Sequence, residues 1–152
     1  MAGPAPPTEL LAQGAWGSVE AVVLASGHCP ALSFLETECE LIREKGKTQP
    51  EATAHARMNV LFQHMANYGR LSAKRFKPER DQFMAFSHEV ANVQVRFPCF
   101  RDGNRWVLTH GFRKPGAKKG RGTWPETEVR RANEIRAEYL RRKATANQGN
   151  ES

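Results

Sequence analysis

Hydrophobic residues in this chain follow two spacings, one typical of strands and one typical of helices. Short runs rich in β-branched and aromatic residues predict strands at 19–24, 82–88, 93–100 and 105–112. Apolar residues three and four positions apart predict three amphipathic helices, with the stripes Leu32, Leu35, Cys39 and Ile42, then Met58, Leu61, Phe62 and Met65, and finally Val129, Ala132, Ile135 and Tyr139. The order β-α-α-β-β-β-α is typical of an α+β domain, with two helices and a C-terminal helix packed on a small, mainly antiparallel sheet.

Capping signals place the ends of the helices. Thr48 and Glu51 have the spacing of a capping box, which predicts the start of the second helix. Gly69 is a natural stop for that helix. A second capping box at Thr123 and Glu126 predicts the start of the last helix.

Turn and breaker residues shape the strands. Residues 101–104 contain an Asp-Gly pair, which is a hairpin signal between the last two strands. Pro98 has no N–H to donate, so it predicts a bulge, or pairing on one side only, in the strand that contains it.

The two ends of the chain differ in composition from its middle. Residues 1–15 are rich in Pro, Ala and Gly, and the prolines remove backbone donors, so we expect a disordered arm there. Residues 144–152 are polar, and we expect a disordered tail. The predicted folded domain is therefore 16–143.

Charge is unevenly distributed along the chain. The net charge is +7, but residues 1–69 have four Lys/Arg and seven Asp/Glu, whereas residues 70–152 have nineteen and nine. A basic half predicts a partner that is a polyanion, although basic surfaces also bind acidic proteins and membranes. No stretch is long and apolar enough for a membrane span, and we expect no signal peptide, because no basic segment followed by an apolar run stands at the start. Three cysteines suit a reducing cytoplasm.

The segment 93–131 holds the candidate chemistry. A strand with Arg96, a turn, a strand ending at Arg113 and Lys114, and a glycine-rich cationic loop suit the binding of a phosphodiester, and RNA is the first substrate to consider. RNA is cleaved when its 2′-OH attacks the neighbouring phosphate, and the planar fork of arginine can stabilise the phosphorane that forms. This chemistry requires no metal and no cofactor.

Further cations and histidines extend this set. The residues expected to bind RNA by their charge are Lys74, Arg75, Lys77, Lys118, Lys119 and Arg121. His110 is the candidate general base or acid, with His88 as a second choice, and each is equally open to a structural role in a strand. Cysteine and histidine occur without C-x-x-C or H-x-x-x-H spacing, so we expect no metal site.

The order of elements and one long motif resemble the RelE/HigB toxins, above all their phage-derived branch. That branch has strands like YRVFY and LLHGFxKK and a helix that starts TPxxEIxxA. Here Gln94–Phe97, Leu108–Lys114 and Thr123–Ala132 hold these places, and CPALSFLE at 29–36 resembles the first helix of that branch. The resemblance covers about 19–140. This chain departs from the pattern of that branch at Pro98 and in the loop PGAKKGRG.

The resemblance implies a RelE-like fold and the toxin of a type II toxin–antitoxin pair. Such toxins are endoribonucleases that cut mRNA on the ribosome, and a cognate antitoxin, often with a helix-turn-helix domain, neutralises them. It also implies that Arg96 faces the scissile phosphate. A non-catalytic RNA- or protein-binding module on the same fold, as in a phage or prophage effector, remains the alternative, and a DNA-binding regulator is a third option.

Overall fold

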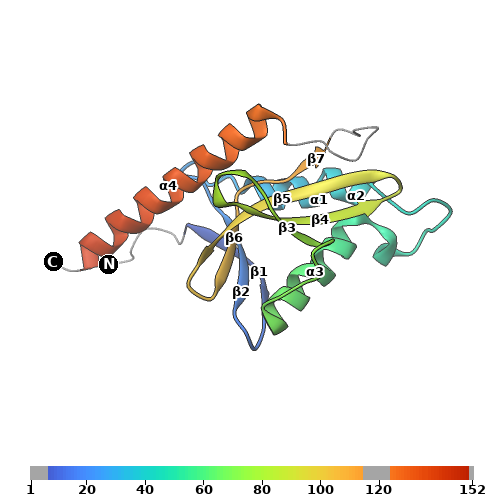
Figure 1. Cartoon of the computed structure of the whole chain (residues 1–152), viewed down its shortest axis with the longest axis horizontal. Helices are drawn as coiled ribbons and strands as arrows, with labels where there is room; N and C mark the ends of the chain where they lie inside the picture. Colours follow the sequence, from blue (N-terminus) through green and yellow to red (C-terminus); the bar gives the residue numbers. More distant parts are fainter. Residues whose placement is uncertain (1–6, 115–123, 151–152) are drawn as a thin grey trace.

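The computed structural model describes residues 7–114 and 124–150, and it confirms an α+β fold (Figure 1). The strands are β1 (Thr8–Gln13), β2 (Ser18–Val22), β3 (Phe76–Pro78), β4 (Met84–Val90), β5 (Val93–Asp102), β6 (Arg105–Leu108) and β7 (Phe112–Lys114). The α-helices are α1 (Pro30–Glu36), α2 (Glu38–Leu41), α3 (Ala54–Tyr68) and α4 (Glu126–Asn150). Short 3₁₀ turns lie at η1 (Pro50–Ala52) and η2 (Arg80–Gln82).

The seven strands of the described residues form one mixed sheet. Its order is β1-β2-β6-β5-β4-β3. β7 lies outside this order and pairs with Gln94–Arg96 of β5, on the same side of β5 as β6. β2 runs parallel to β6, and the other pairs are antiparallel. A parallel neighbour requires a crossover, and the segment that holds α1, α2 and α3 supplies part of it.

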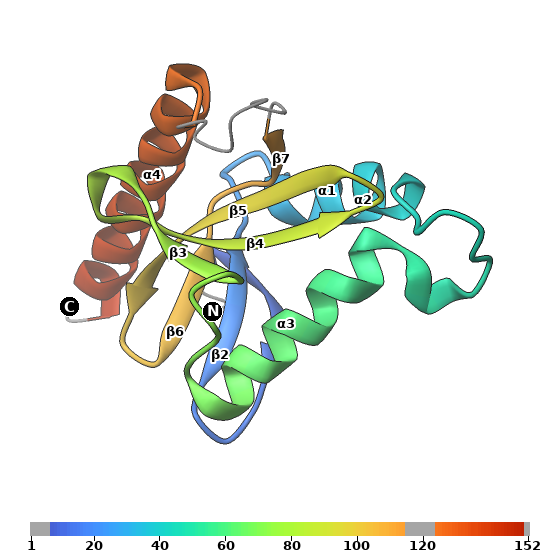
Figure 2. The same ribbon diagram turned by 45° about the vertical axis from the view of Figure 1, so that its right-hand side comes forward.

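Helices cover the two faces of the sheet (Figure 2). α1, α2 and α3 pack on one face, where Leu35, Met58 and Phe62 meet Phe86 and Phe97 of the sheet. α4 packs on the other face, in a second core that includes the residues Val22, Phe83, Phe100, Phe112, Trp124, Val129, Ile135 and Tyr139. Alternation along β5 divides its side chains between these two cores.

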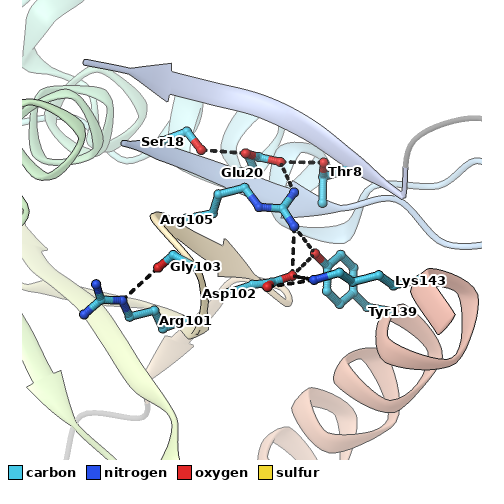
Figure 3. A network of polar contacts seen from close by, with 9 residues as sticks. All are labelled: Thr8, Ser18, Glu20, Arg101, Asp102, Gly103, Arg105, Tyr139 and Lys143. Carbon is cyan, nitrogen blue, oxygen red and sulfur yellow. Dashed lines mark hydrogen bonds and ion pairs between the residues drawn. The ribbon is translucent and has the colours of Figure 1, made fainter. Parts of the chain in front are cut away.

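A polar network attaches α4 to the sheet at the β5–β6 turn (Figure 3). Asp102 accepts hydrogen bonds from Lys143 Nζ (2.6 Å), Tyr139 Oη (2.6 Å) and Arg105 (2.8 Å). Arg105 also donates to Glu20 on β2 (3.1 Å). The network therefore joins β2, β5 and β6 to α4, and each of its charged groups has a partner of opposite charge.

The expected disordered ends are wrong over most of their length. Residues 8–13 form β1, because the prolines end at Pro7 and every later residue of this stretch can donate an N–H to β2. Residues 144–150 continue α4, whose regular backbone extends past the last buried apolar residue, Tyr139. Residues 1–6 and 151–152 lie outside the described part of the chain.

Two helix predictions need correction. The first apolar stripe is buried as expected, with Leu35 and Cys39 inaccessible, but the helix breaks at Thr37 and the chain is extended at Ile42. The second helix begins after Thr53, whose Oγ1 accepts from the Ala56 N–H (3.1 Å), and not at Thr48. Pro50 and Glu51 form the 3₁₀ turn η1 instead.

Other boundary predictions are confirmed. Gly69 ends α3 with a φ of 74°, a left-handed conformation suited to glycine. Asp102 pairs with Arg105 around a two-residue hairpin loop. Opposite Pro98 the predicted fourth strand splits into β6 and β7. β5 therefore pairs without a break with β4 from Val93 to Cys99, whereas its pairing on the other side is interrupted.

Candidate functional site

A hollow of about 210 Å³ opens at the edge of the sheet where β3 begins. It is lined by Lys74, Arg75, Lys77, Ser87, His88, Glu89, Gln94 and Arg96. β3 pairs with Met84–Phe86, so from Ser87 onward β4 has no partner strand on that side among the described residues. Side chains from the loop before β3 and from both faces of β4 therefore meet at this open edge. We call it the cationic hollow.

Arg96 is the buried member of the cationic hollow, with only 3% of its surface exposed. Its guanidinium donates to the Val95 carbonyl (3.2 Å) and to Gln94 Oε1 (3.0 Å), while its buried Nε–H has no partner. Burial lowers the pKa of Arg96, and the nearby carboxylates Glu79 and Glu89 oppose that shift. The side chain is thus fixed in position and has an unused donor.

Three more cations approach from the connector before β3. Lys74 is exposed, and Arg75 and Lys77 are half-buried. The Arg75 carbonyl accepts from the Ser87 N–H (2.8 Å), which anchors the connector to β4. Among the described residues, none of these three cations, nor Arg96, forms a salt bridge with a carboxylate, so their charge remains available to a ligand.

His88 is the histidine of the cationic hollow. Burial and the positive charge of Arg75 lower its pKa to about 4, so the ring is neutral at pH 7. The Arg75 guanidinium contacts Nδ1, and because arginine can only donate, Nδ1 must be the acceptor. The proton therefore lies on Nε2, and His88 offers a hydrogen-bond donor and not a strong base.

Arg113 does not join Arg96. Residues directly opposite in an antiparallel pair project from the same face, and Arg96 lies opposite Phe112 while Arg113 lies opposite Val95. Arg113 points to the face of α1–α3 and pairs there with Glu38 of α2 (2.8 Å). The prediction that Arg96 and Arg113 together bind a phosphodiester is wrong, because a one-residue step along a strand reverses the face.

Lys114 lies on the same face as Arg96, opposite Gln94. Burial and the charge of Arg96 lower its pKa, and Glu79 opposes that shift. The pKa of Glu79 is raised by burial, against the attraction of Lys114 and Arg96. The charges of Lys114 and Glu79 thus act on Arg96, but neither residue lines the cationic hollow.

His110 is a core residue, which overturns its selection as a proton-transfer group. It is fully buried, its Nδ1 lies 3.0 Å from Thr109 Oγ1, and its Nε2 lies 3.1 Å from the carboxylate of Glu128 on α4. Burial lowers its pKa to about 3. The short polar break between β6 and β7 holds this ring inward, where it ties the strands to α4.

Other expected site residues lie outside what the structure describes or outside any cluster. Lys118, Lys119 and Arg121 fall in 115–123, beyond the described residues. Within the described residues, no group of three or more His, Cys, Asp or Glu side chains could hold a metal ion. No helix of that described part is both long and apolar enough to cross a bilayer.

Sequence reasoning missed Ser87, Glu89 and Gln94 in the lining. Gln94 precedes Arg96 by two positions, so the strand period alone places both on one face. Ser87 lies directly opposite Arg96, but this pairing depends on the register of the β4–β5 hairpin. Ala91 and Asn92 form the turn of this hairpin with positive φ. Because neither residue is a glycine, the sequence does not mark this turn as a hairpin turn.

Comparisons with protein-family models, with curated proteins and with solved structures find no match to this chain.

Proposed function

We propose that the protein is the toxin of a type II toxin–antitoxin system, a metal-independent endoribonuclease that cuts mRNA on the ribosome. The observation that carries this proposal is the cationic hollow, where four cations line a space of about 210 Å³ and none of them forms a salt bridge with a carboxylate of the described residues. Preorganised cations of this kind are suited to a phosphate whose charge grows in the transition state. The resemblance of the motif around Arg96 to the RelE/HigB toxins supports the same proposal.

The proposed reaction begins when the 2′-oxygen attacks the adjacent phosphorus. A new P–O2′ bond forms and the P–O5′ bond breaks, which leaves a 2′,3′-cyclic phosphate and a 5′-hydroxyl. Arg96 stabilises the phosphorane through its fixed guanidinium, and Lys74 and Lys77 hold the flanking phosphates. The 2′-OH proton passes to solvent, and the departing 5′-oxygen takes a proton from solvent. The Nε2–H of His88 donates a hydrogen bond to a phosphate oxygen.

A matched pair of arginine variants tests the proposal. Arg96→Gln and Arg113→Gln change the same residue type on paired strands, but only Arg96 lies in the cationic hollow. Purified ribosomes with a defined mRNA supply the assay, and primer extension reads the cut sites. We expect Arg96→Gln to lower the cleavage rate by about 100-fold to 1,000-fold, and Arg113→Gln to cut at the wild-type rate. Equal rates for wild type and Arg96→Gln would refute the mechanism.

The alternative is an RNA-binding module without catalysis on the same hollow. One observation favours it: His88 and His110 are the histidines of the last three predicted strands, and both have pKa values well below neutrality. Under this alternative wild type binds RNA, loses affinity in Arg96→Gln, and leaves the mRNA intact.

A further inference from the structure

The lining of the cationic hollow includes the backbone edge of strand β4. β4 continues beyond its pairing with β3 (Figure 2), and Ser87, His88 and Glu89 line the hollow there. Ser87 and Glu89 project from one face of the strand and His88 from the other. Side chains from both faces can line one space only where that space reaches the edge between the faces. A ligand in the hollow therefore meets the main chain of β4.

The register of the β4–β5 hairpin shows which backbone groups point to that edge. In an antiparallel pair, residues that exchange two hydrogen bonds alternate with residues that exchange none. Val90 and Val93 close the two-residue turn, so they form a bonded pair. Glu89 and Gln94 form the next pair, which exchanges no backbone bonds. The N–H and C=O of Glu89 therefore point away from β5, to the open edge.

The N–H of Ser87, two residues earlier on β4, confirms this alternation. It donates to the Arg75 carbonyl on the open side of the strand (2.8 Å). β3 does not extend as far as Glu89, and no group of the described residues on that side hydrogen-bonds to the N–H or C=O of Glu89. Since Glu89 is exposed, both groups remain available to a ligand in the hollow.

The side chain of Glu89 adds a further acceptor at the same place. It is the one carboxylate among the described residues that line the hollow. Gln94 Nε2 donates to its Oε1 (3.2 Å), and Gln94 Oε1 accepts from Arg96 (3.0 Å), so Gln94 links this carboxylate to the central arginine. A carboxylate weakens the attraction of the hollow for phosphate, so its presence there favours a ligand that also offers hydrogen-bond donors.

Glu89 thus presents one donor, the N–H, and two acceptors, the C=O and the carboxylate. The Watson–Crick edge of guanine has the complementary pattern, with O6 as the acceptor and N1–H and the N2 amino group as the donors. Adenine, cytosine and uracil each have a single donor group on that edge. Among the four bases of RNA, guanine alone can satisfy all three groups of Glu89.

We propose that the edge of β4 at Glu89 binds a guanine base of single-stranded RNA. The Glu89 N–H donates to O6, while its backbone carbonyl and carboxylate accept from N1–H and the N2 amino group. Ser87 lies opposite Arg96, so two residues of strand, about 7 Å, separate the level of the phosphate site from that of the base site. This inference rests on the proposed function, because it places RNA in the cationic hollow.

Inosine tests the number of donors, because it differs from guanosine only in lacking the N2 amino group. The probes are two short fluorescein-labelled oligouridines, one with a central guanosine and one with a central inosine, and fluorescence anisotropy measures their binding to the full chain. We expect wild type to bind the guanosine RNA about tenfold more tightly, because inosine leaves one acceptor of Glu89 without a donor. Equal affinities for the two RNAs overturn the proposal.

A Glu89→Gln variant separates base recognition from general electrostatics. If Glu89 only repelled phosphate, its neutralisation would strengthen the binding of both RNAs and leave their ratio unchanged. We expect the preference for guanosine over inosine to fall instead to within about twofold. Glu51→Gln is the matched control, since it removes the same charge from an exposed residue outside the hollow and should keep the preference. An unchanged preference in Glu89→Gln overturns the proposal.

An Arg96→Gln variant distinguishes the failure of this site from the failure of the proposed function. If wild type binds both RNAs equally and Arg96→Gln weakens both, the guanine site is wrong and the RNA site in the hollow stands. If Arg96→Gln binds both RNAs as tightly as wild type, the RNA does not occupy the cationic hollow and both proposals fail.

Discussion

The two ends of strand β5 use the same residue types for opposite purposes. Near its start, Arg96 meets Lys74, Arg75 and Lys77 in the cationic hollow, with no salt bridge to a carboxylate of the described residues. Near its end, Asp102 and Glu20 match Arg105 and Lys143, and Tyr139 closes the network (Figure 3). One end has unpaired positive charge and the other has charge that is largely paired.

This difference separates a structural role from a binding role. Paired charges at the β5–β6 turn hold α4 on the sheet. A ligand could bind these charged groups only by breaking the salt bridges between them. Cations without counter-ions repel one another and weaken the fold slightly, but they attract an anion. The presence or absence of counter-ions, and not the residue type, therefore distinguishes the binding site from the structural network on this strand.

The largest expected effect on stability comes from removing Asp102. Asp102→Asn leaves Arg105 and Lys143 without their shared carboxylate, so we expect the free energy of unfolding to fall by about 2–3 kcal/mol. Urea denaturation measures the loss. RNA affinity of the folded variant should match wild type, and a change in affinity with unchanged stability would contradict the division of roles.

A smaller effect, on affinity alone, is expected in the cationic hollow. Lys74→Gln with Lys77→Gln removes two charges that have no carboxylate partner, so RNA affinity should fall by about tenfold, which is about 1.4 kcal/mol. The slope of log affinity against log salt should decrease by about 1–2 for single-stranded RNA. Filter binding over a salt series measures both quantities, and the urea midpoint is the control, expected to stay unchanged.

The two ends of β5 should also differ in how their stability contribution depends on pH, and His88 determines this dependence in the cationic hollow. His88 is neutral in the folded state down to about pH 4, whereas in the unfolded chain it is protonated below its ordinary pKa of 6.5. Between these two values the unfolded state binds more protons, so stability is lost as the pH falls from about 6.5 to about 4. His88→Gln should flatten part of this decline in urea unfolding at several pH values.

The control for this pH series is Asp102→Asn. The pKa of Asp102 is lowered in the folded state, because Lys143, Tyr139 and Arg105 favour its carboxylate over the opposing effect of burial. Its contribution is present above the ordinary aspartate pKa of 3.8 and is lost as the pH falls below that value. Asp102→Asn should therefore change the curve at the acid end and keep the decline that His88 causes.

The smallest expected effect belongs to Arg113. Its salt bridge with Glu38 is about half exposed on both sides, so Arg113→Gln should cost no more than about 0.5 kcal/mol in urea denaturation. RNA binding should be unchanged, since the side chain faces α2 and not the cationic hollow. A loss of RNA affinity in this variant would show that the binding surface extends around the sheet edge.

The sequence predicted the elements better than their junctions. The stripes of α3 and α4 and the strands β4 and β5 follow from periodicity, because burial on one face imposes a regular spacing. The start of α3 at Thr53 and the strand β1 were missed. Thr48 and Thr53 are both acceptable N-cap residues, so the sequence does not choose between them. Local composition does not show that residues 8–13 pair with β2.

The sequence by itself determined the α+β class, the basic C-terminal half and the set of cations from which a site could be built. Only the tertiary structure decided that Arg96 joins Lys74, Arg75 and Lys77, that Arg113 turns to Glu38, and that His110 is sealed in the core. The physical reason is register: hydrophobic spacing fixes which residues are buried, but the pairing of strands fixes which charges meet, and one step along a strand reverses the face.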